Sequence, residues 1–511
     1  MQQPFIRKVA SLPLYSNEDI AWLERHKNMP LLHALKDYSK HDIVPFDVPG
    51  HKRGRGVPIL NEFFGHDLLQ MDVNSLPLLD NASHPTGVIK EAQTLLAEAY
   101  QADEAFFITN GTTSAIHCML MSVLEPGDKV LLPRNIHKSA MNGLILCGAI
   151  PVYVKTQMTH DGLVGNVEVH DIEEMLNLHP DTKAVFVLNP TYYGYTADLE
   201  KIVQICHEKE VLVLVDEAHG AHLPFHEELP KSGMECGADM SCVSIHKTGG
   251  ALTQASALLI NHKRVNAKKV RQVINMLQST SCSYLLMSSL DGARQNLVLN
   301  GRNQLTHVLN LSTMARKRLD NIKGIKVVEA ISNQVGQYDI TKLGINVSGL
   351  GLSGFEVYEL MWKQFNIQLE MPDFNHVLAI MSLGDCEEHI ERLITAFDII
   401  SKHYAKATKS KIIQKIQYVQ PKVSVSPRVA YYSDKEAVPL EQAHGRLCGE
   451  SIMAYPPGIP IIAPGEVMTK EIIHRIQTLK TSGAFMTDSY DRTLEKILVL
   501  TNEQEDIKGE I

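Results

Sequence analysis

A run of five apolar residues, 211–215 (VLVLV), sets the strongest limit on the fold of this 511-residue chain. The run is too short for a helix and too uniformly apolar for a strand with one face in water. It therefore predicts a central parallel strand that is buried on both faces. Asp216 and His219 follow directly. Because open parallel sheets bind ligands at the carboxyl ends of their strands, we expect both side chains at a binding edge.

A second stretch, residues 239–248, repeats this pattern and ends near Lys247. Lys247 lies 31 residues after Asp216 (247 − 216), which leaves room for one crossover back to the same sheet edge. A lysine amine can form a Schiff base with pyridoxal 5′-phosphate (PLP), while a carboxylate keeps the pyridine nitrogen protonated. Taken alone, an aspartate and a lysine at such positions are more often a helix cap and a surface cation. Whether they form a PLP site therefore depends on the other residues of the chain.

Composition describes an ordinary enzyme of two or three domains. The chain is 44% apolar and 21% charged, and its net charge of −9 argues against a nucleic-acid partner. No apolar run approaches the ~20 residues that span a bilayer, and the first residues do not resemble a signal peptide. The eight cysteines lack metal-ligand spacing. We expect a cytoplasmic protein without a metal or a membrane partner.

Strand and helix patterns alternate from residue 105 to 261, which predicts an α/β domain with a mainly parallel sheet. Shorter strands mixed with helices over 324–405 predict a small α+β domain. The expected division is an N-terminal helical arm (1–45), a large PLP-binding domain (46–310), the small α+β domain (311–410) and a C-terminal domain (411–511).

Several polar groups follow the predicted strands. Residues 110–114 (NGTTS) join a strand to a helix N-terminus, where free N–H groups and hydroxyls favour a phosphate, although an ordinary helix cap uses the same residue types. Ser244 and His246 could supply further hydrogen-bond donors to the phosphate. His137 follows a predicted strand and could lie flat over one face of the cofactor ring. Ala218 is small enough to let the other face of the ring approach the backbone. The expected cofactor-binding residues are Gly111, Thr112, Thr113, Ser114, His137, Asp216, Ala218, Ser244, His246 and Lys247.

Short motifs spread over about residues 45–470 together resemble those of the Orn/Lys/Arg decarboxylases of PLP fold type I, especially the short bacterial arginine/lysine decarboxylases. The fold that this implies is aspartate aminotransferase-like. The resemblance also implies Lys247 as the Schiff-base lysine, Asp216 on the pyridine nitrogen and His137 stacked on the ring. The motifs are VPGHK (48–52), HPTG (84–87), TNGT (109–112), RN (134–135), HKS (137–139), NPTYYG (189–194), DEAH (216–219), HKT (246–248), SYLLM (283–287) and YPPGIP (455–460).

Three features depart from the family pattern, the first two from that of its larger members. The first motif begins at Val48, which leaves no room for their N-terminal wing domain and makes assembly into large rings doubtful. His219 stands where they have Trp, so its role toward the substrate is open. Cys282 replaces a Pro in the loop whose Thr280 and Ser281 we expect to reach the cofactor of the neighbouring subunit.

The expected activity is decarboxylation of a dibasic amino acid, with arginine first, lysine second and ornithine third, in a homodimer or a dimer of dimers. Lys247, Asp216, His137 and His219 are the expected catalytic residues. Glu466 follows a proline-stiffened loop, so we expect it to hold the distal cation of the substrate, unless it only begins a helix. The alternatives are an aminotransferase, an acyl-CoA condensing synthase, or a non-catalytic regulatory paralogue.

Overall fold

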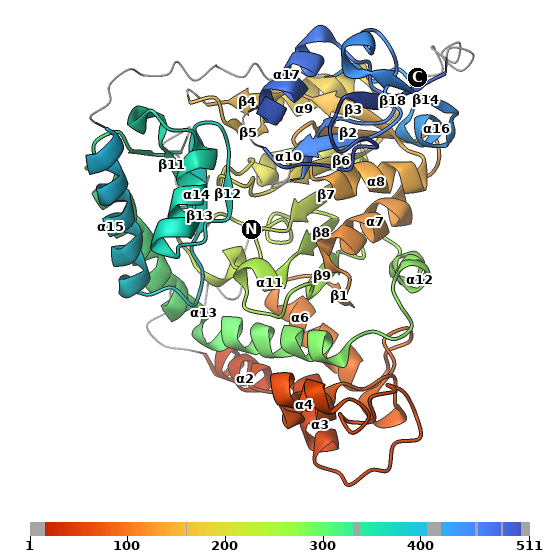
Figure 1. Cartoon of the computed structure of the whole chain (residues 1–511). Coiled ribbons are helices and arrows are strands. Elements are labelled where there is room, and N and C mark those ends of the chain that lie inside the picture. The colour runs from red at the N-terminus through yellow and green to blue at the C-terminus, as the bar shows by residue number, and fades with distance from the viewer. Residues whose placement is uncertain are drawn as a thin grey trace. The chain divides into compact units, whose positions relative to one another are not determined.

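The computed structural model describes residues 16–159, 161–330, 338–405, 421–454, 458–481 and 484–501. The chain divides into two compact units, each built from two stretches of sequence: Met1–Val123 with Leu214–Thr306, and Leu124–Val213 with His307–Ile511. Each is described by itself below, with the element labels of Figure 1. The predicted division at residues 45, 310 and 410 stays a prediction.

The first unit carries strands in the order β1-β9-β8-β7 (Figure 1). β1 (Glu104–Ile108) pairs antiparallel with β9 (Ser256–Ile260), which also pairs antiparallel with β8 (Met240–Val243). β8 and β7 (Leu212–Glu217) are parallel, with Asp216 opposite Cys242. Every residue of β7 is buried. This confirms the fully buried strand that the apolar run predicts.

Helices pack on these strands. α7 (Gly111–Val123) contacts β1, β8 and β9, and α12 (Ala267–Leu277) packs on α7. α6 (Val88–Ala99) contacts β1 and α3 (Pro30–Ser39). The connection from α2 (Asn17–His26) to α3 is held by the first part of α13 (Tyr284–Leu319). There a buried Arg294–Asp291 ion pair hydrogen-bonds to the backbone of residues 26–32.

The second unit begins with three parallel strands in the order β6-β2-β3: β6 (Thr182–Leu188), β2 (Lys129–Pro133) and β3 (Ile150–Val154). The connecting helices are α8 (Lys138–Cys147), α9 (Val169–Leu178) and α10 (Leu199–Glu208). The mainly parallel α/β sheet that the sequence predicts is thus confirmed, and among its described pairings β9 is the strand that runs antiparallel to both of its neighbours, β1 and β8.

The same unit contains the small α+β part. Its antiparallel sheet has the order β10-β11-β13-β12: β10 (Lys326–Val327), β11 (Lys342–Asn346), β13 (His376–Ile380) and β12 (Met371–Pro372). The core of this part also contains α14 (Gly354–Phe365) and α15 (Glu387–Tyr404), whose apolar faces pack with the sheet.

The C-terminal part has its own core, in which α17 (Lys470–Thr481) packs with two small sheets. One pairs β14 (Lys435–Pro439) with β18 (Lys496–Leu500). The other has the order β16-β15-β17: β16 (Ile459–Ile462), β15 (Ile452–Ala454) and β17 (Met486–Thr487). Residues 1–15 of the expected arm and residues 455–457 of the YPPGIP motif lie outside the described residues. No helix in the described ranges combines the length and the apolarity needed to cross a membrane.

Candidate active site

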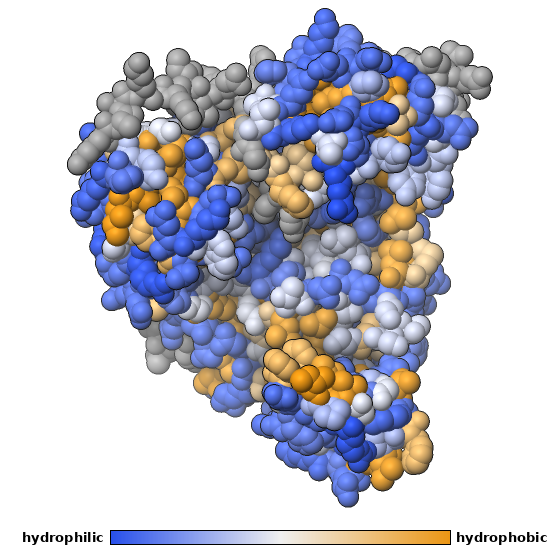
Figure 2. Space-filling view, viewed as in Figure 1, coloured by the Kyte–Doolittle hydropathy of each residue, from blue (hydrophilic) through white to orange (hydrophobic). Residues whose placement is uncertain are grey.

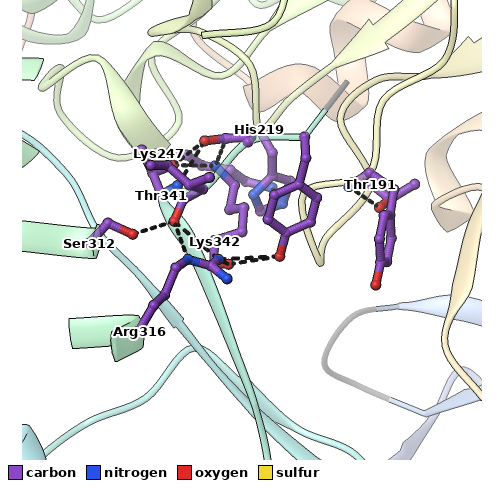
Figure 3. A network of polar contacts seen from close by, with 11 residues as sticks. Thr191, His219, Lys247, Ser312, Arg316, Thr341 and Lys342 are labelled. Carbon is purple, nitrogen blue, oxygen red and sulfur yellow. Dashed lines mark hydrogen bonds and ion pairs between the residues drawn. The ribbon is translucent and has the colours of Figure 1, made fainter. Parts of the chain in front are cut away.

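Lys247 and His219 meet beyond the ends of the parallel pair β7 and β8. β8 ends at Val243, and the short helix α11 (Ile245–Thr248) carries Lys247, while His219 lies two residues after β7. The Lys247 Nζ is 2.9 Å from the His219 Nε2 (Figure 3). Because parallel strands end at one edge of a sheet, side chains from two segments far apart in sequence come into hydrogen-bond contact there.

Asp216 is a buried carboxylate beside this lysine, with only 2% of its surface exposed. Its Oδ1 accepts hydrogen bonds from the Ala218 N–H at 3.0 Å and from the Cys242 thiol, with the sulfur 3.9 Å away. Burial raises the pKa of Asp216, and the positive charge of Lys247 opposes that rise. Among the described residues, no hydrogen bond reaches its Oδ2. The Oδ2 of Asp216 could accept a hydrogen bond from the pyridinium N–H of PLP. The positive charge of that ring would offset the cost of burying the carboxylate.

Three hydroxyl groups from separate elements converge at the start of α7. Thr112 Oγ1 hydrogen-bonds to the Ser244 Oγ, and it lies 3.1 Å from the Ser256 Oγ on β9. α7 begins at Gly111, whose φ of +73° is one that L side chains rarely adopt. Residues 111–114 form the first turn of this helix. The free N–H groups of such a turn together with hydroxyls fit a phosphate.

His246 is oriented by the backbone of the strand next to it. Its Nδ1 is 3.1 Å from the Ala255 carbonyl oxygen, which makes Nδ1 the donor and fixes the proton there. Burial, aided by the charge of Lys247, lowers the pKa of His246. Ala218 is half-buried, and Thr113 is exposed.

Three predicted site residues are not joined to this cluster by described contacts. His137 belongs to the second unit, where it caps α8 and its Nδ1 lies 2.8 Å from the Ser139 Oγ. Thr280 and Ser281 are exposed, in the segment between α12 and α13. The buried Cys282 thiol that follows them lies 2.9 Å from the Ser279 carbonyl oxygen and ties this turn together. The roles expected for His137, Thr280 and Ser281 stay predictions.

Glu466 has a different environment from the one expected. Its carboxylate is 1% exposed and forms a two-point ion pair with Arg134, at 2.9 and 2.8 Å. The Tyr153 hydroxyl and the Ala463 N–H also donate to it. It does not begin a helix either, since α17 starts at Lys470. A substrate cation would have to displace a buried guanidinium, so the geometry favours an anchoring role for Glu466 over substrate binding.

Breaking this ion pair should cost stability. Glu466→Gln leaves the Arg134 guanidinium buried without a counter-charge, and we expect the free energy of unfolding to fall by about 3 kcal/mol in urea titrations. The matched control is the double variant Arg134→Met/Glu466→Met, which removes both charges and should recover most of the loss. A Glu466→Gln protein of unchanged stability and a strongly raised Michaelis constant for the dibasic substrate would restore the substrate-binding role.

Three residues of these clusters escaped the sequence argument. Ser256 is the one polar residue of β9, and it stands at the start of that strand, which is the signal that could have found it. Cys242 lies beside Ser241 in β8, so no such signal singles it out. Arg134 follows β2 within a recognised motif. Its pairing with Glu466, 332 residues later, has no local signal in the sequence.

Comparisons with known proteins agree with this geometry. The family model for the major domain of the Orn/Lys/Arg decarboxylases matches residues 29–343, and the model for their C-terminal domain matches residues 408–487. An arginine decarboxylase of Halalkalibacterium halodurans is 40% identical over 94% of this chain and 99% of its own length. One from Bacillus subtilis is 39% identical over 93% and 98%.

Solved structures agree in fold. A lysine decarboxylase of Francisella novicida superposes with a TM-score of 0.82 over 93% of this chain and 82% of its own, at 21% identity. Lysine decarboxylase A of Pseudomonas aeruginosa gives 0.81 over 97% and 82%, at 22% identity. The fold is therefore that of the PLP fold type I decarboxylases. From the two family models and the full-length relatives we conclude that this chain belongs to the Orn/Lys/Arg decarboxylase family.

Proposed function

We propose that this protein is a PLP-dependent carboxy-lyase that removes the carboxylate of a dibasic L-amino acid, with arginine as the preferred substrate over lysine and ornithine. The observation that carries the proposal is the Lys247 amine beside the buried Asp216 carboxylate, in a chain 40% identical to an arginine decarboxylase. The more distant relatives include a lysine decarboxylase at 24% identity and an ornithine decarboxylase at 23%. This ordering supports arginine first.

The residues divide the work as follows. Lys247 would hold PLP covalently, and Gly111, Thr112, Thr113, Ser114, Ser244 and His246 would hold its phosphate. PLP supplies an electron sink for the electrons left when carbon dioxide departs. Asp216 would keep a proton on the pyridine nitrogen, while Ala218 admits one face of the ring and His137 covers the other. His137 and His219 are the groups available to steer the carboxylate or to move protons.

The distal cation of the substrate needs an anion, because an unpaired guanidinium in a closed site is costly. Glu466 is engaged with Arg134, and Asp373 accepts hydrogen bonds from the Tyr193 hydroxyl and from His376. Glu370 is exposed, and no ion pair or side-chain hydrogen bond of its carboxylate is described. We therefore propose Glu370 as the first carboxylate to test.

Product analysis tests the activity directly. The protein with PLP is incubated separately with L-arginine, L-lysine and L-ornithine, and the released amine is identified by mass spectrometry, with carbon dioxide measured in parallel. We expect agmatine to form fastest, in keeping with a cytoplasmic enzyme of polyamine synthesis. Keto acid in place of carbon dioxide would indicate an aminotransferase instead, and no reaction with any of the three would reject the proposal.

We also propose that the active unit is a homodimer. An apolar surface on the first unit supports this: Phe46 is 95% exposed and Phe63 75%, and their apolar neighbours in sequence Val44, Val48, Ile59 and Phe64 are also exposed. Figure 2 shows apolar residues at the surface of the part that carries α3 and α4 (Pro58–Phe64). A second copy of the chain, covering such residues, would remove them from water and bring Thr280 and Ser281 to the partner's cofactor.

Mixing two inactive variants tests the shared site. Lys247→Ala and Thr280→Ala/Ser281→Ala proteins should each be inactive, while co-refolded mixtures should regain up to about a quarter of wild-type activity, since only hybrid dimers hold one intact site. Sedimentation measures the dimer independently. A fully active monomer would rule the shared site out.

A further inference from the structure

We propose that His219 is the hydrogen-bond acceptor that holds the free amine of Lys247 in its reacting position. This role rests on the proposed PLP chemistry at Lys247 and deepens it. It separates the two histidines that the mechanism leaves interchangeable, because it assigns His219 to the lysine nitrogen.

The contact has the geometry of a hydrogen bond. The two nitrogens are 2.9 Å apart, and the His219 side chain is 2% exposed. A lysine amine is principally a donor, so the His219 Nε2 accepts and the neutral ring carries its proton on Nδ1. His219 follows β7 and Lys247 sits on α11, so the bond joins the ends of two strands that are parallel neighbours.

Two other ionisable groups of the same unit, Asp216 and His246, feel the charge of Lys247, but their described hydrogen bonds go to other partners. Asp216 feels its charge, but the described hydrogen bonds of that carboxylate come from Ala218 and Cys242. His246 also feels the charge, and its Nδ1 is committed to the Ala255 carbonyl. The hydrogen bond between Lys247 and His219 therefore does not compete with the described hydrogen bonds of Asp216 and His246.

An acceptor at this place would matter because, in the proposed function, Lys247 would both hold PLP and release it. A free lysine side chain has four rotatable bonds, and ordering it costs conformational entropy. A fixed acceptor keeps the amine near the point of reaction, and reactions between well-oriented groups are faster. His219 would thus speed the return of the lysine without being needed for PLP to bind.

The test separates binding of the cofactor from capture by the lysine. Protein freed of PLP is mixed with PLP in a stopped-flow instrument, and the visible absorbance that follows covalent attachment gives the rate of capture. Affinity for the phosphate seat and ring is measured with 4′-deoxypyridoxine 5′-phosphate, which has no aldehyde. His219→Leu should slow capture on the order of tenfold, because it removes the hydrogen bond that holds the amine in place, while the affinity for the analogue stays within about twofold.

His219→Gln is the matched variant, since its amide oxygen can accept from the amine, and it should recover part of the rate. Circular dichroism checks that both variants fold, and ¹⁵N-histidine spectra of the unmutated protein report whether the His219 Nε2 is the unprotonated nitrogen. Capture at the wild-type rate in His219→Leu, equal losses of capture and analogue affinity, or a proton on Nε2 would overturn the role. If the wild-type protein neither attaches PLP nor releases an amine, the proposed function itself fails.

Discussion

Lys247→Ala should abolish decarboxylation and covalent attachment of PLP together. In the proposed function this lysine would be the amine that holds the cofactor, and alanine offers no nitrogen for that role. We expect a fall in kcat of at least about 10⁴-fold, equivalent to about 5 kcal/mol or more of barrier. Borohydride reduction followed by peptide mass spectrometry should find PLP on Lys247 in the wild type and on no peptide of the variant.

A surface lysine of the same unit provides the control. Lys90 pairs with Glu104 at 2.6 Å and is partly exposed, so Lys90→Ala should keep both the activity and the modified Lys247 peptide. PLP found on another lysine of an active Lys247→Ala protein would show that the cofactor lysine has been misassigned. Because the borohydride reaction needs no substrate, this readout stands even where the preferred amino acid differs from arginine.

The fold was predictable wherever a local pattern decides the structure. The apolar run at 211–215 predicts a strand buried on both faces, and β7 is buried throughout. The alternation of strand and helix patterns over residues 105–261 predicts a mainly parallel α/β sheet, and the seven-stranded sheet that contains β7 is one. The reversed direction of β9, which runs antiparallel to both β1 and β8, was not predictable, because its apolar sequence does not encode a direction and its pairing with β1 joins residues about 150 positions apart.

The site was predictable in its residue types but only partly in its contacts. Residues that follow parallel strands meet at one edge, so Lys247 and His219 could be expected there from topology alone. Their hydrogen bond could not, since it depends on side-chain directions in α11 and in the turn after β7. Glu466 shows the opposite case. A lone carboxylate after a rigid loop looked available to a substrate, and its partner Arg134 lies in a distant motif.

Asp216→Ala should leave PLP attached to Lys247 and yet reduce decarboxylation by several orders of magnitude. Without a carboxylate beside it, the pyridine nitrogen does not keep its proton, and the cofactor becomes a weak electron sink. A loss of about 4 kcal/mol corresponds to nearly a thousandfold in kcat. Cys242→Ala is the matched control, because it removes one neighbour of the same carboxylate and keeps the charge, so its kcat should stay within about tenfold of wild type.

The buried carboxylate of Asp216 should also lower the stability of the PLP-free protein, and its melting temperature can be measured without turnover. Burial raises the pKa of Asp216 in the PLP-free protein, so its ionised form is disfavoured by folding. That penalty is absent at low pH, where the acid is protonated in both states, and it appears as the pH rises above the ordinary range of an aspartate. Asp216→Asn should therefore melt at a higher temperature than wild type near pH 7 without PLP, with a gap that narrows on acidification. Calorimetry over pH 4–8 measures this. If the PLP-free Asp216→Asn protein melts below wild type at every pH, the Asp216 carboxylate stabilises the fold, and its burial is not evidence for a role in binding a cofactor.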